Sequence, residues 1–318
     1  MKTVYITTMM IAAFLMLTLP LSAKNRLENL PVSALPMTEN GQSDILDDPV
    51  KIKITAKNEV VSIALEDYIF GVVAAEMPAL YETEALKAQA VAAYTFYLTR
   101  LDPTNSQDFD ITDDYTTDQA FITVESAREK WGDGADAYEE KIRGAVRSVL
   151  GKRVLYNGEL ARTVYHAISF GVTENAVDVW GGEYPYLVSV DSSFDKLSQD
   201  YIEEKTFTAE NFKTLLSSIA EVKDLDKNCV SDIIKTTAGG VKSLKISGKE
   251  VTGADFRKAL SLRSSCFELT FNLGKYTIKT QGYGHSVGMS QNGANYLAQR
   301  GKTYEEILLH YYTDCTVE

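Results

Sequence analysis

The sequence predicts an α+β fold, in which antiparallel hairpins and a mixed sheet pack with helices around a substrate groove. Signals for hairpins outnumber the strand–helix–strand signals that a parallel sheet requires. Residues 50–54 alternate apolar and polar side chains, which is typical of a half-buried strand. Asn157-Gly158 lies between two β-rich runs and indicates a type I′ hairpin turn. Apolar residues recur at helical spacing through residues 83–98, so this stretch predicts a helix with a narrow face of small side chains.

The other elements follow from local signals of the same kind, with caps and glycines marking their ends. The predicted strands cover residues 50–54, 60–64, 185–191, 233–237, 241–246, 266–272 and 276–280. The predicted helices cover residues 65–76, 83–98 and 135–150, with four more that start at the capping hydroxyls of Thr208, Thr252, Ser290 and Thr303. The helix that starts at Thr208 is expected to run to about Ala220.

Residues 1–23 predict an N-terminal membrane anchor or signal segment. Val4 to Leu21 is almost entirely apolar and is about long enough to span a bilayer. Leu21-Ser22-Ala23 is an imperfect cleavage site, so retention and cleavage both stay open, and either outcome places the bulk of the protein outside the cytoplasm. Residues 24–48 are polar and predict a linker, and residues 49–318 predict one folded domain.

Composition argues against several classes of function. The chain of 318 residues carries a net charge of −12, which argues against nucleic acid as a partner. No Cys-x-x-Cys pair exists, so a zinc site built on thiolates is not expected. One disulfide could form in an oxidising compartment, but we expect free, buried thiols at Cys229, Cys266 and Cys315. The aspartates of residues 102–118 lack the offsets of an EF-hand, so they predict a solvated loop rather than a calcium site.

Glu76 is the candidate general acid. Pro78 biases Met77 away from helical angles, so the helix that starts at Leu65 is expected to end at or near Glu76. The C-terminal end of a helix disfavours an anion, and the preceding residues 72–75 are all apolar. Both effects raise the pKa of a carboxyl group, which is how a general acid is prepared near neutral pH. The alternative is a solvated glutamate at a frayed helix end.

Three segments carry a family resemblance. They are GVVAAEMPALYETEALKAQAVAAYTF at residues 71–96, YHAISFGVTENAVDVWG at residues 165–181 and GYGHSVGMSQNGA at residues 282–294. In this order they resemble the signature of the stage II sporulation protein D family. That family comprises lytic transglycosylases that act on the glycan strands of peptidoglycan, together with amidase-enhancer relatives. The resemblance covers roughly residue 50 to the C-terminus.

The resemblance implies a function and a set of site residues. The implied activity is lytic cleavage of peptide-stripped glycan strands to 1,6-anhydro products during endospore formation and engulfment, with Glu76 as the catalytic acid and base. The residues implied to bind substrate along the groove are Lys87, Gln89, His166, Asp178, His285, Ser290 and Gln291. No cofactor is implied, and because the second segment has no cysteine we expect no metal there.

The implied partners are peptidoglycan glycan strands, a cell-wall amidase and a membrane recruiter protein. Sporulation members of the family are held by one N-terminal membrane helix, which favours retention of residues 1–23 at the cell membrane.

Two other functions stay open. A non-catalytic, glycan-binding amidase enhancer is supported by one departure, since the chain has Tyr94-Thr95-Phe96 where the family usually has Arg-Thr-Tyr. Loss of that arginine would remove a fixed charge near the groove. A metal-dependent hydrolase could use His166, His285 and His310, although their spacing gives no support to a shared metal.

Overall fold

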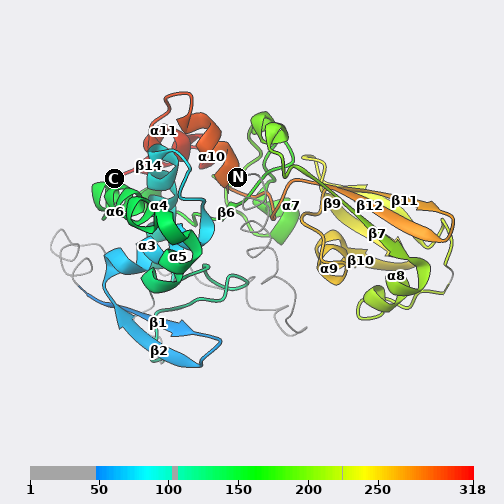
Figure 1. The fold of residues 1–318 in the computed structure, drawn as a ribbon. Coiled ribbons are helices and arrows are strands. Elements are labelled where there is room, and N and C mark those ends of the chain that lie inside the picture. The colour runs from blue at the N-terminus through cyan, green and yellow to red at the C-terminus, as the bar shows by residue number, and fades with distance from the viewer. Residues whose placement is uncertain (1–47, 102–106, 224) are drawn as a thin grey trace.

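The computed structural model describes residues 48–101, 107–223 and 225–318 (Figure 1). The predicted anchor, residues 1–23, and all but the last residue of the predicted linker lie outside the described residues. Within the described ranges, every helix is too short or too polar to cross a membrane.

The domain predicted for residues 49–318 contains two hydrophobic cores, which appear as two lobes in Figure 1. The second lobe, residues 202–281, is inserted into the main lobe, which the described residues 48–201 and 282–318 form. The core of the second lobe lies around Phe212, Phe256 and Tyr276. The sequence pattern indicated these hairpins but not the boundary of a second core.

The main lobe contains most of the helices. Its elements before the insertion are β1 (Val50–Ile54), β2 (Glu59–Ile63), α3 (Leu65–Glu76), α4 (Thr83–Leu98), β3 (Ile111–Thr112), α5 (Val124–Trp131), η1 (Gly132–Gly134), α6 (Ala135–Val149), β4 (Val154–Tyr156), β5 (Glu159–Leu160), β6 (Tyr165–His166), α7 (Ala176–Trp180) and η2 (Ser193–Leu197). Its elements after the insertion are β13 (Met289–Ser290), α10 (Gln291–Ala298), α11 (Tyr304–Tyr311) and β14 (Thr316–Val317).

The second lobe packs two helices against two three-stranded antiparallel sheets. Its elements are β7 (Ile202–Thr208), α8 (Ala209–Leu216), β8 (Val230–Lys235), β9 (Val241–Ile246), β10 (Lys249–Thr252), α9 (Gly253–Ala259), β11 (Phe267–Asn272) and β12 (Lys275–Gln281). The sheets have the strand orders β10-β9-β8 and β11-β12-β7.

The predicted α+β class is confirmed. The main lobe has small sheets with the orders β2-β1-β3, β13-β6 and β14-β4-β5, of which the pairs β1–β3 and β13–β6 are parallel. The other described strand pairs are antiparallel, so the structure has the mixture of hairpins and mixed sheet that the pattern indicated. The predicted substrate groove stays a prediction.

Helix α4 runs through the core of the main lobe. It packs against α3, α6, α10 and α11, and every residue from Ala88 to Leu98 is buried. The predicted face of small residues is therefore part of a buried surface that extends around the helix, as expected of a helix that is apolar on all sides. The many alanines leave room for close neighbours on each side.

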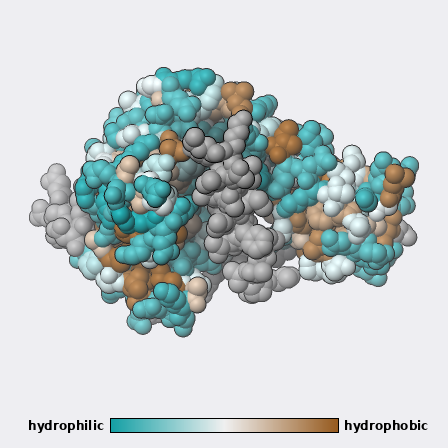
Figure 2. Space-filling model, viewed as in Figure 1, coloured by the Kyte–Doolittle hydropathy of each residue, from teal (hydrophilic) through white to brown (hydrophobic). Residues whose placement is uncertain are grey.

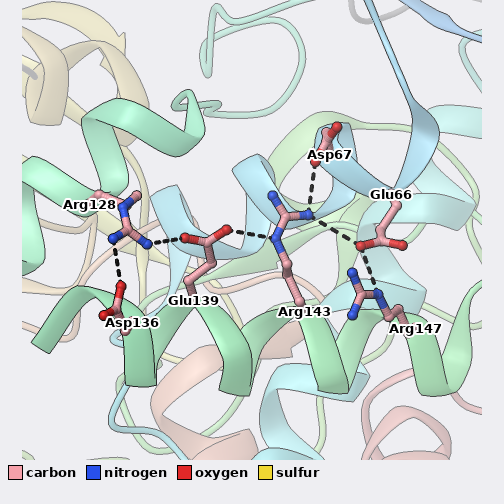
Figure 3. Close-up of polar contacts among 7 residues, drawn as sticks. All are labelled: Glu66, Asp67, Arg128, Asp136, Glu139, Arg143 and Arg147. Atoms are coloured by element: carbon pink, nitrogen blue, oxygen red, sulfur yellow. Dashed lines mark hydrogen bonds and ion pairs between the residues drawn. The ribbon is translucent and has the colours of Figure 1, made fainter.

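An ion network on the surface joins α6 to α3 and α5 (Figure 3). Arg143 lies at its centre and pairs with Asp67 at 2.8 Å and with Glu139 at 2.9 Å. Arg128 pairs with Asp136 at 2.6 Å, and Arg147 extends the network to Glu66 at 2.9 Å. The two acidic residues on α3 lie in its first turn, where the helix dipole favours negative charge. The network holds α5 next to α3.

The predicted turns and caps are largely confirmed. Asn157 and Gly158 have φ values of 52° and 82°, as a type I′ turn requires. The hydroxyls of Thr208, Thr252 and Ser290 accept backbone N–H bonds at their helix starts, and Thr303 forms a complete capping box with Glu306.

Three predicted elements differ from the structure, and one of them is the strand expected at residues 233–237, which the structure places at Val230–Lys235. The strand expected at residues 185–191 does not form, and only Asp191 makes an isolated bridge, to Val172. The reason is that its backbone groups bond to a mixture of side chains (Asn175 and Thr173) and backbone N–H groups (Thr173 and Ala176) rather than to one continuous strand. Helix α8 ends at Leu216 rather than near Ala220.

The acidic loop is fixed along strand β1. Asp110 accepts the backbone N–H of Lys51 at 2.8 Å, and Asp113 accepts that of Thr55 at 2.8 Å. These two carboxylates therefore accept hydrogen bonds from backbone N–H groups. None of the three cysteines forms a disulfide; Cys229 and Cys315 are buried, and Cys266 is half-buried.

The molecular surface seen in Figure 2 is mostly hydrophilic, with hydrophobic residues in small separate patches on both lobes.

Candidate functional site

Glu76 is the last residue of α3, as predicted. The next residue, Met77, adopts extended angles, and its N–H donates to the carbonyl of Val73 at 2.9 Å to close the helix. Burial raises the pKa of the Glu76 carboxyl group, while hydrogen bonds from Gln291 and from the backbone of Ala120 oppose this rise. Burial is the largest of these effects, so the structure favours a protonated acid at Glu76.

Gln291 and Gln89 meet Glu76 at this position. Gln291 Nε2 donates to Glu76 Oε2 at 3.0 Å and lies 3.4 Å from Gln89 Oε1. Gln89 is fully buried. Its side chain also interacts with Tyr165, where it lowers the pKa of the phenol against the larger effect of burial. Gln89 is therefore part of the hydrogen-bonded surroundings of Glu76.

A third glutamine, Gln119, lies next to this cluster. Gln119 is 3% exposed, its Nε2 donates to the Tyr68 hydroxyl at 2.9 Å, and its Oε1 accepts from the Tyr165 hydroxyl at 2.7 Å. The following residue, Ala120, supplies the backbone contact to Glu76. Gln119 therefore positions a donor to the acid, although sequence reasoning did not include it in the site.

The third motif reaches Glu76 through a short parallel strand pair. Strand β13 pairs with β6, so that Ser290 lies opposite His166. The Ser290 hydroxyl accepts the N–H of Gly293 at 3.1 Å and caps α10, whose first residue is Gln291. Ser290 is fully buried, and its observed role is to start the helix that presents Gln291.

His166, His285 and Trp180 form an aromatic row beside this strand pair. The imidazole centroids of His166 and His285 are 5.6 Å apart, and the ring of Trp180 is 5.1 Å from that of His285. His166 Nδ1 bonds to the Val287 carbonyl at 3.1 Å, so this nitrogen carries the proton in the neutral ring. Burial lowers the pKa of both histidines, and the neutral forms are favoured.

Asp178 lies at the junction of the two lobes. Its carboxylate pairs with Lys242 Nζ of the second lobe at 3.2 Å and accepts a hydrogen bond from Asn175 Nδ2 at 3.2 Å. The hydrogen bond from Asn175, followed by that from Lys242, lowers the pKa of Asp178. These contacts hold α7, and so Trp180, against the second lobe.

Lys87 is not brought to the Glu76 cluster. It lies two residues before Gln89 on α4, which places it about 200° around the helix from that residue. Its Nζ pairs with Glu84 at 2.7 Å, and the other Glu84 oxygen accepts the N–H of Tyr304 at the start of α11. The observed contacts of Lys87 therefore support the packing of α4 and α11.

Lys130 is the cation that acts on Glu76. It lies on α5, and its Nζ donates to the carbonyl of Ala74 at 3.4 Å. Its charge opposes the rise in the pKa of Glu76. No local signal in the sequence relates Lys130 to a helix that ends 54 residues earlier.

Two buried carboxylates join the motifs to one another. Asp195 accepts the backbone N–H of Ser169 and the side-chain amide of Asn292, each at 2.9 Å. Glu174 is 1% exposed and accepts the Thr236 hydroxyl of the second lobe at 2.7 Å. Glu174 stood in the second motif, but its role in joining the lobes had no sequence signal.

Tyr94 occupies a different side of α4 from Gln89. The two residues are five positions apart, or about 140° around the helix. Tyr94 is 3% exposed in the main core; burial raises its pKa, and the charge of Arg153 opposes that rise. The residue that replaces the arginine of the family pattern thus lies with Arg153 rather than with the Glu76 cluster.

His310 is held apart from the histidine row by its own contacts. Its Nε2 bonds to the carbonyl of Asp191 at 2.8 Å, and its ring lies 6.4 Å from that of Phe194. In the part of the chain that the structure describes, no three His, Cys, Asp or Glu side chains form a group that could hold a metal ion.

Comparison with known proteins agrees with the motif resemblance. Residues 53–156 match the model of a family described as Stage II sporulation protein. The chain is 39% identical over 292 residues to Stage II sporulation protein D of Bacillus subtilis (strain 168), covering 90% of this chain and 83% of the relative. It is 38% identical over 282 residues to Stage II sporulation protein D of Bacillus amyloliquefaciens, covering 86% and 80%.

A more divergent relative, named Amidase enhancer in Bacillus subtilis (strain 168), is 27% identical over 298 residues, covering 78% of this chain and 40% of that protein. The first two relatives match almost the whole length of the chain, both lobes included. This chain therefore belongs to the stage II sporulation protein D family.

Proposed function

We propose that this protein is a lytic transglycosylase that cleaves peptide-stripped glycan strands of peptidoglycan and leaves a 1,6-anhydro end. The observation that carries the proposal is the environment of Glu76. Its carboxyl group ends an apolar helix, burial raises its pKa, and Gln291 binds one of its oxygens at 3.0 Å. A carboxyl group kept protonated and fixed in place is suited to general acid catalysis.

The proposed reaction needs a single acid. Protonated Glu76 donates its proton to the glycosidic oxygen as the bond from that oxygen to C1 breaks. The resulting carboxylate then takes the proton of the sugar's own 6-hydroxyl group, whose oxygen forms the new bond to C1. Glu76 ends the cycle protonated, and no water is consumed.

The charges around Glu76 favour this scheme over a two-carboxylate hydrolase. Glycoside hydrolases of the common types place a second carboxylate within about 5–9.5 Å of the acid. Such a neighbour would raise the pKa of Glu76, but the groups that act on it are Gln291, Ala120 and Lys130, of which only Lys130 is charged. The described surroundings of Glu76 thus suit one acid that works alone.

Replacement of Glu76 tests the proposal. Glu76→Gln keeps the hydrogen-bonding shape but removes the proton donor, and we expect cleavage of purified, peptide-free glycan strands to fall by roughly 10²–10⁴-fold. Glu82→Gln is the matched control, because Glu82 is exposed and lies six residues further along the chain. Mass spectrometry counts the 1,6-anhydro ends. Undiminished formation of these ends by Glu76→Gln would refute the assignment.

The alternative is a glycan-binding module that stimulates a cell-wall amidase without cleaving glycan. It is favoured by the similarity to a relative named Amidase enhancer. The two functions separate when the protein is incubated with glycan strands alone. Release of anhydro products without any amidase supports the enzyme, whereas release that depends on an added amidase supports the enhancer.

The proposal includes a location. Residues 1–23 would hold the protein at the cell membrane with residues 49–318 on the outer side, where the glycan strands, an amidase and a membrane recruiter protein would be its partners. Fractionation of cells that express the full chain, followed by protease treatment of intact cells, tests this arrangement.

A further inference from the structure

We propose that Arg257 of the second lobe, together with His166, His285 and Trp180, forms a subsite for a sugar that carries a free carboxylate. This subsite rests on the proposed function, because it names the part of the glycan strand that the protein selects. In a strand stripped of its peptides, the lactyl group of each muramic acid residue ends in such a carboxylate. In a strand that still carries peptides, the same group is an uncharged amide.

Arg257 is a half-buried cation without an ion-pair partner. Its Nε donates to the carbonyl of Leu262 at 3.2 Å, and it makes no ion pair with any side chain of the described ranges. The neighbouring Arg263, by contrast, pairs with Glu203 at 3.1 Å and with Asp200 at 3.5 Å. Partly desolvated charges in proteins are usually paired, so an unpaired guanidinium is a candidate for binding an anion.

Backbone contacts hold Arg257 next to the loop that carries His285. The carbonyl of Leu262 fixes the guanidinium, and the following residue, Arg263, accepts the N–H of Gly284 at 2.9 Å. The Arg263 guanidinium also lies 5.4 Å from the ring of Tyr283. The segment that follows α9 therefore bonds both to the Arg257 guanidinium and to the loop at residues 282–285. In agreement, the Arg257 charge helps to lower the pKa of both His166 and His285.

His166 offers an unused acceptor at the same place. The residue is 4% exposed, and its Nδ1 is engaged by the Val287 carbonyl. Its Nε2 is buried and has no partner among the described residues. In the neutral tautomer that this bond sets, Nε2 is a hydrogen-bond acceptor. A sugar hydroxyl or an acetamido N–H group would satisfy it, and the adjacent Trp180 ring offers an apolar face to a sugar ring.

The subsite is continuous with the Glu76 cluster. Gln291, which binds Glu76, directly follows Ser290, and Ser290 lies opposite His166 in the β13–β6 pair. From His166 the row continues to His285 and then to Trp180. A strand bound along this row would have its scissile bond at the main lobe and a neighbouring carboxylate at the second lobe. The insertion would then act as a selector for peptide-free glycan.

The experiment measures binding rather than cleavage. The full chain with Glu76→Gln keeps the ligand intact, and isothermal titration calorimetry compares two probes. One is a tetrasaccharide of alternating N-acetylglucosamine and N-acetylmuramic acid with free lactyl carboxylates, and the other is chitotetraose, which has none. We expect the first to bind about tenfold more tightly, and adding Arg257→Met to abolish this preference while chitotetraose binding stays within about twofold.

Two controls keep the result interpretable. Lys258→Met removes an equal charge from the next, exposed residue of α9 and should keep the tenfold preference. Converting the lactyl carboxylates of the tetrasaccharide to carboxamides should abolish the preference without any change in the protein, so the test survives if Arg257→Met fails to fold. The subsite is refuted if the Glu76→Gln protein shows no preference or binds neither probe, if Arg257→Met retains the preference, or if the carboxamide binds as tightly as the acid.

The binding experiment and the cleavage experiment can fail independently of each other. If the wild-type protein releases no anhydro ends but the Glu76→Gln protein retains the Arg257-dependent preference, the transglycosylase assignment fails and the subsite stands. If cleavage proceeds and the preference is absent, the enzyme stands and the subsite fails.

Discussion

Gln291 Nε2 donates to Glu76 Oε2 at 3.0 Å, although the two residues are 215 positions apart in the chain. Gln291 is the first residue of α10, and Glu76 is the last residue of α3. The contact therefore joins one helix start to one helix end. It fixes the direction in which the Glu76 carboxyl group points, and a fixed direction is what proton transfer to a bound sugar requires.

Loss of the Gln291 amide should impair catalysis without unfolding the protein. Gln291→Leu removes the donor to Glu76 and leaves the carboxyl group free to rotate. We expect the rate of glycan cleavage at saturating substrate to fall about tenfold, because a hydrogen bond to a catalytic group contributes roughly 1–3 kcal/mol. Gln299→Leu makes the same chemical change at an exposed position after α10 and should retain full activity. Equal rates for the two variants would contradict the role given to Gln291.

Removal of the Lys130 charge should shift the pH profile of cleavage. Since the Lys130 ammonium opposes the rise in the pKa of Glu76, Lys130→Met should raise that pKa further. The acid must be protonated to act, so the alkaline limb of the profile should move to higher pH, while the rate well below the limb changes by less than about twofold. Lys130→Arg keeps the positive charge and should leave the alkaline limb at the same pH as in the wild type. A limb that stays in place in Lys130→Met, or that moves to lower pH, would show that Lys130 does not act on Glu76.

Glu174 should make the folded protein less stable as the pH rises. Burial raises the pKa of this carboxyl group above its ordinary value of 4.5, so between the two values the folded state binds more protons than the unfolded state. The free energy of unfolding must then decrease with rising pH through this window. Glu174→Gln cannot ionise, and urea denaturation at a series of pH values should give a flatter profile than the wild type. If the free energy of unfolding of Glu174→Gln falls with pH as steeply as that of the wild type, Glu174 is not the source of the pH dependence.

Gly288 is required for the strand pair that presents Gln291. It has a φ of 70°, and an added Cβ would lie 2.2 Å from the carbonyl oxygen of Val164. Gly301 has a similar φ of 81° but open space around the Cβ position, so Gly301→Ala should cost only the backbone strain of about 1–2 kcal/mol. Gly288→Ala should cost a further 1–3 kcal/mol or so for the clash. Thermal melts of the two variants test this difference, and equal melting temperatures would contradict it.

Local structure was predictable from sequence wherever a few neighbouring residues determine it. Helices α3 and α4 have the predicted bounds, because Pro78 stops the first and the spacing of apolar residues sets the second. The turn at Asn157-Gly158 formed for an equally local reason, namely that both positions need positive φ. The strand expected at residues 185–191 did not form, because its partners are side-chain and backbone groups of residues 173–176 rather than a continuous strand.

The candidate site also has one part that the sequence predicts and another that depends on the folded structure. Glu76 could be singled out because its unusual features are local, namely a carboxyl group at the end of an apolar helix that proline terminates. The cation that acts on the pKa of Glu76 could not be identified from sequence. Lys87 and Lys130 both lie on helices, and only the packing of α5 against α3 brings Lys130 rather than Lys87 close to Glu76. Nothing in the local sequence around Arg257 relates it to His285, which belongs to the other lobe.

The sequence by itself determined the bounds of α3 and α4, the Asn157-Gly158 turn, the helix caps and the family to which its motifs point, and it singled out Glu76 as the candidate acid. Only the tertiary structure decided which side chains surround that glutamate, that residues 202–281 form a second core, and that an unpaired arginine from this lobe lies near the histidine row. The physical reason is the distance along the chain over which each effect acts. Dihedral preferences and caps act over a few residues, whereas charge pairing and burial depend on which distant segments the folded chain places in contact.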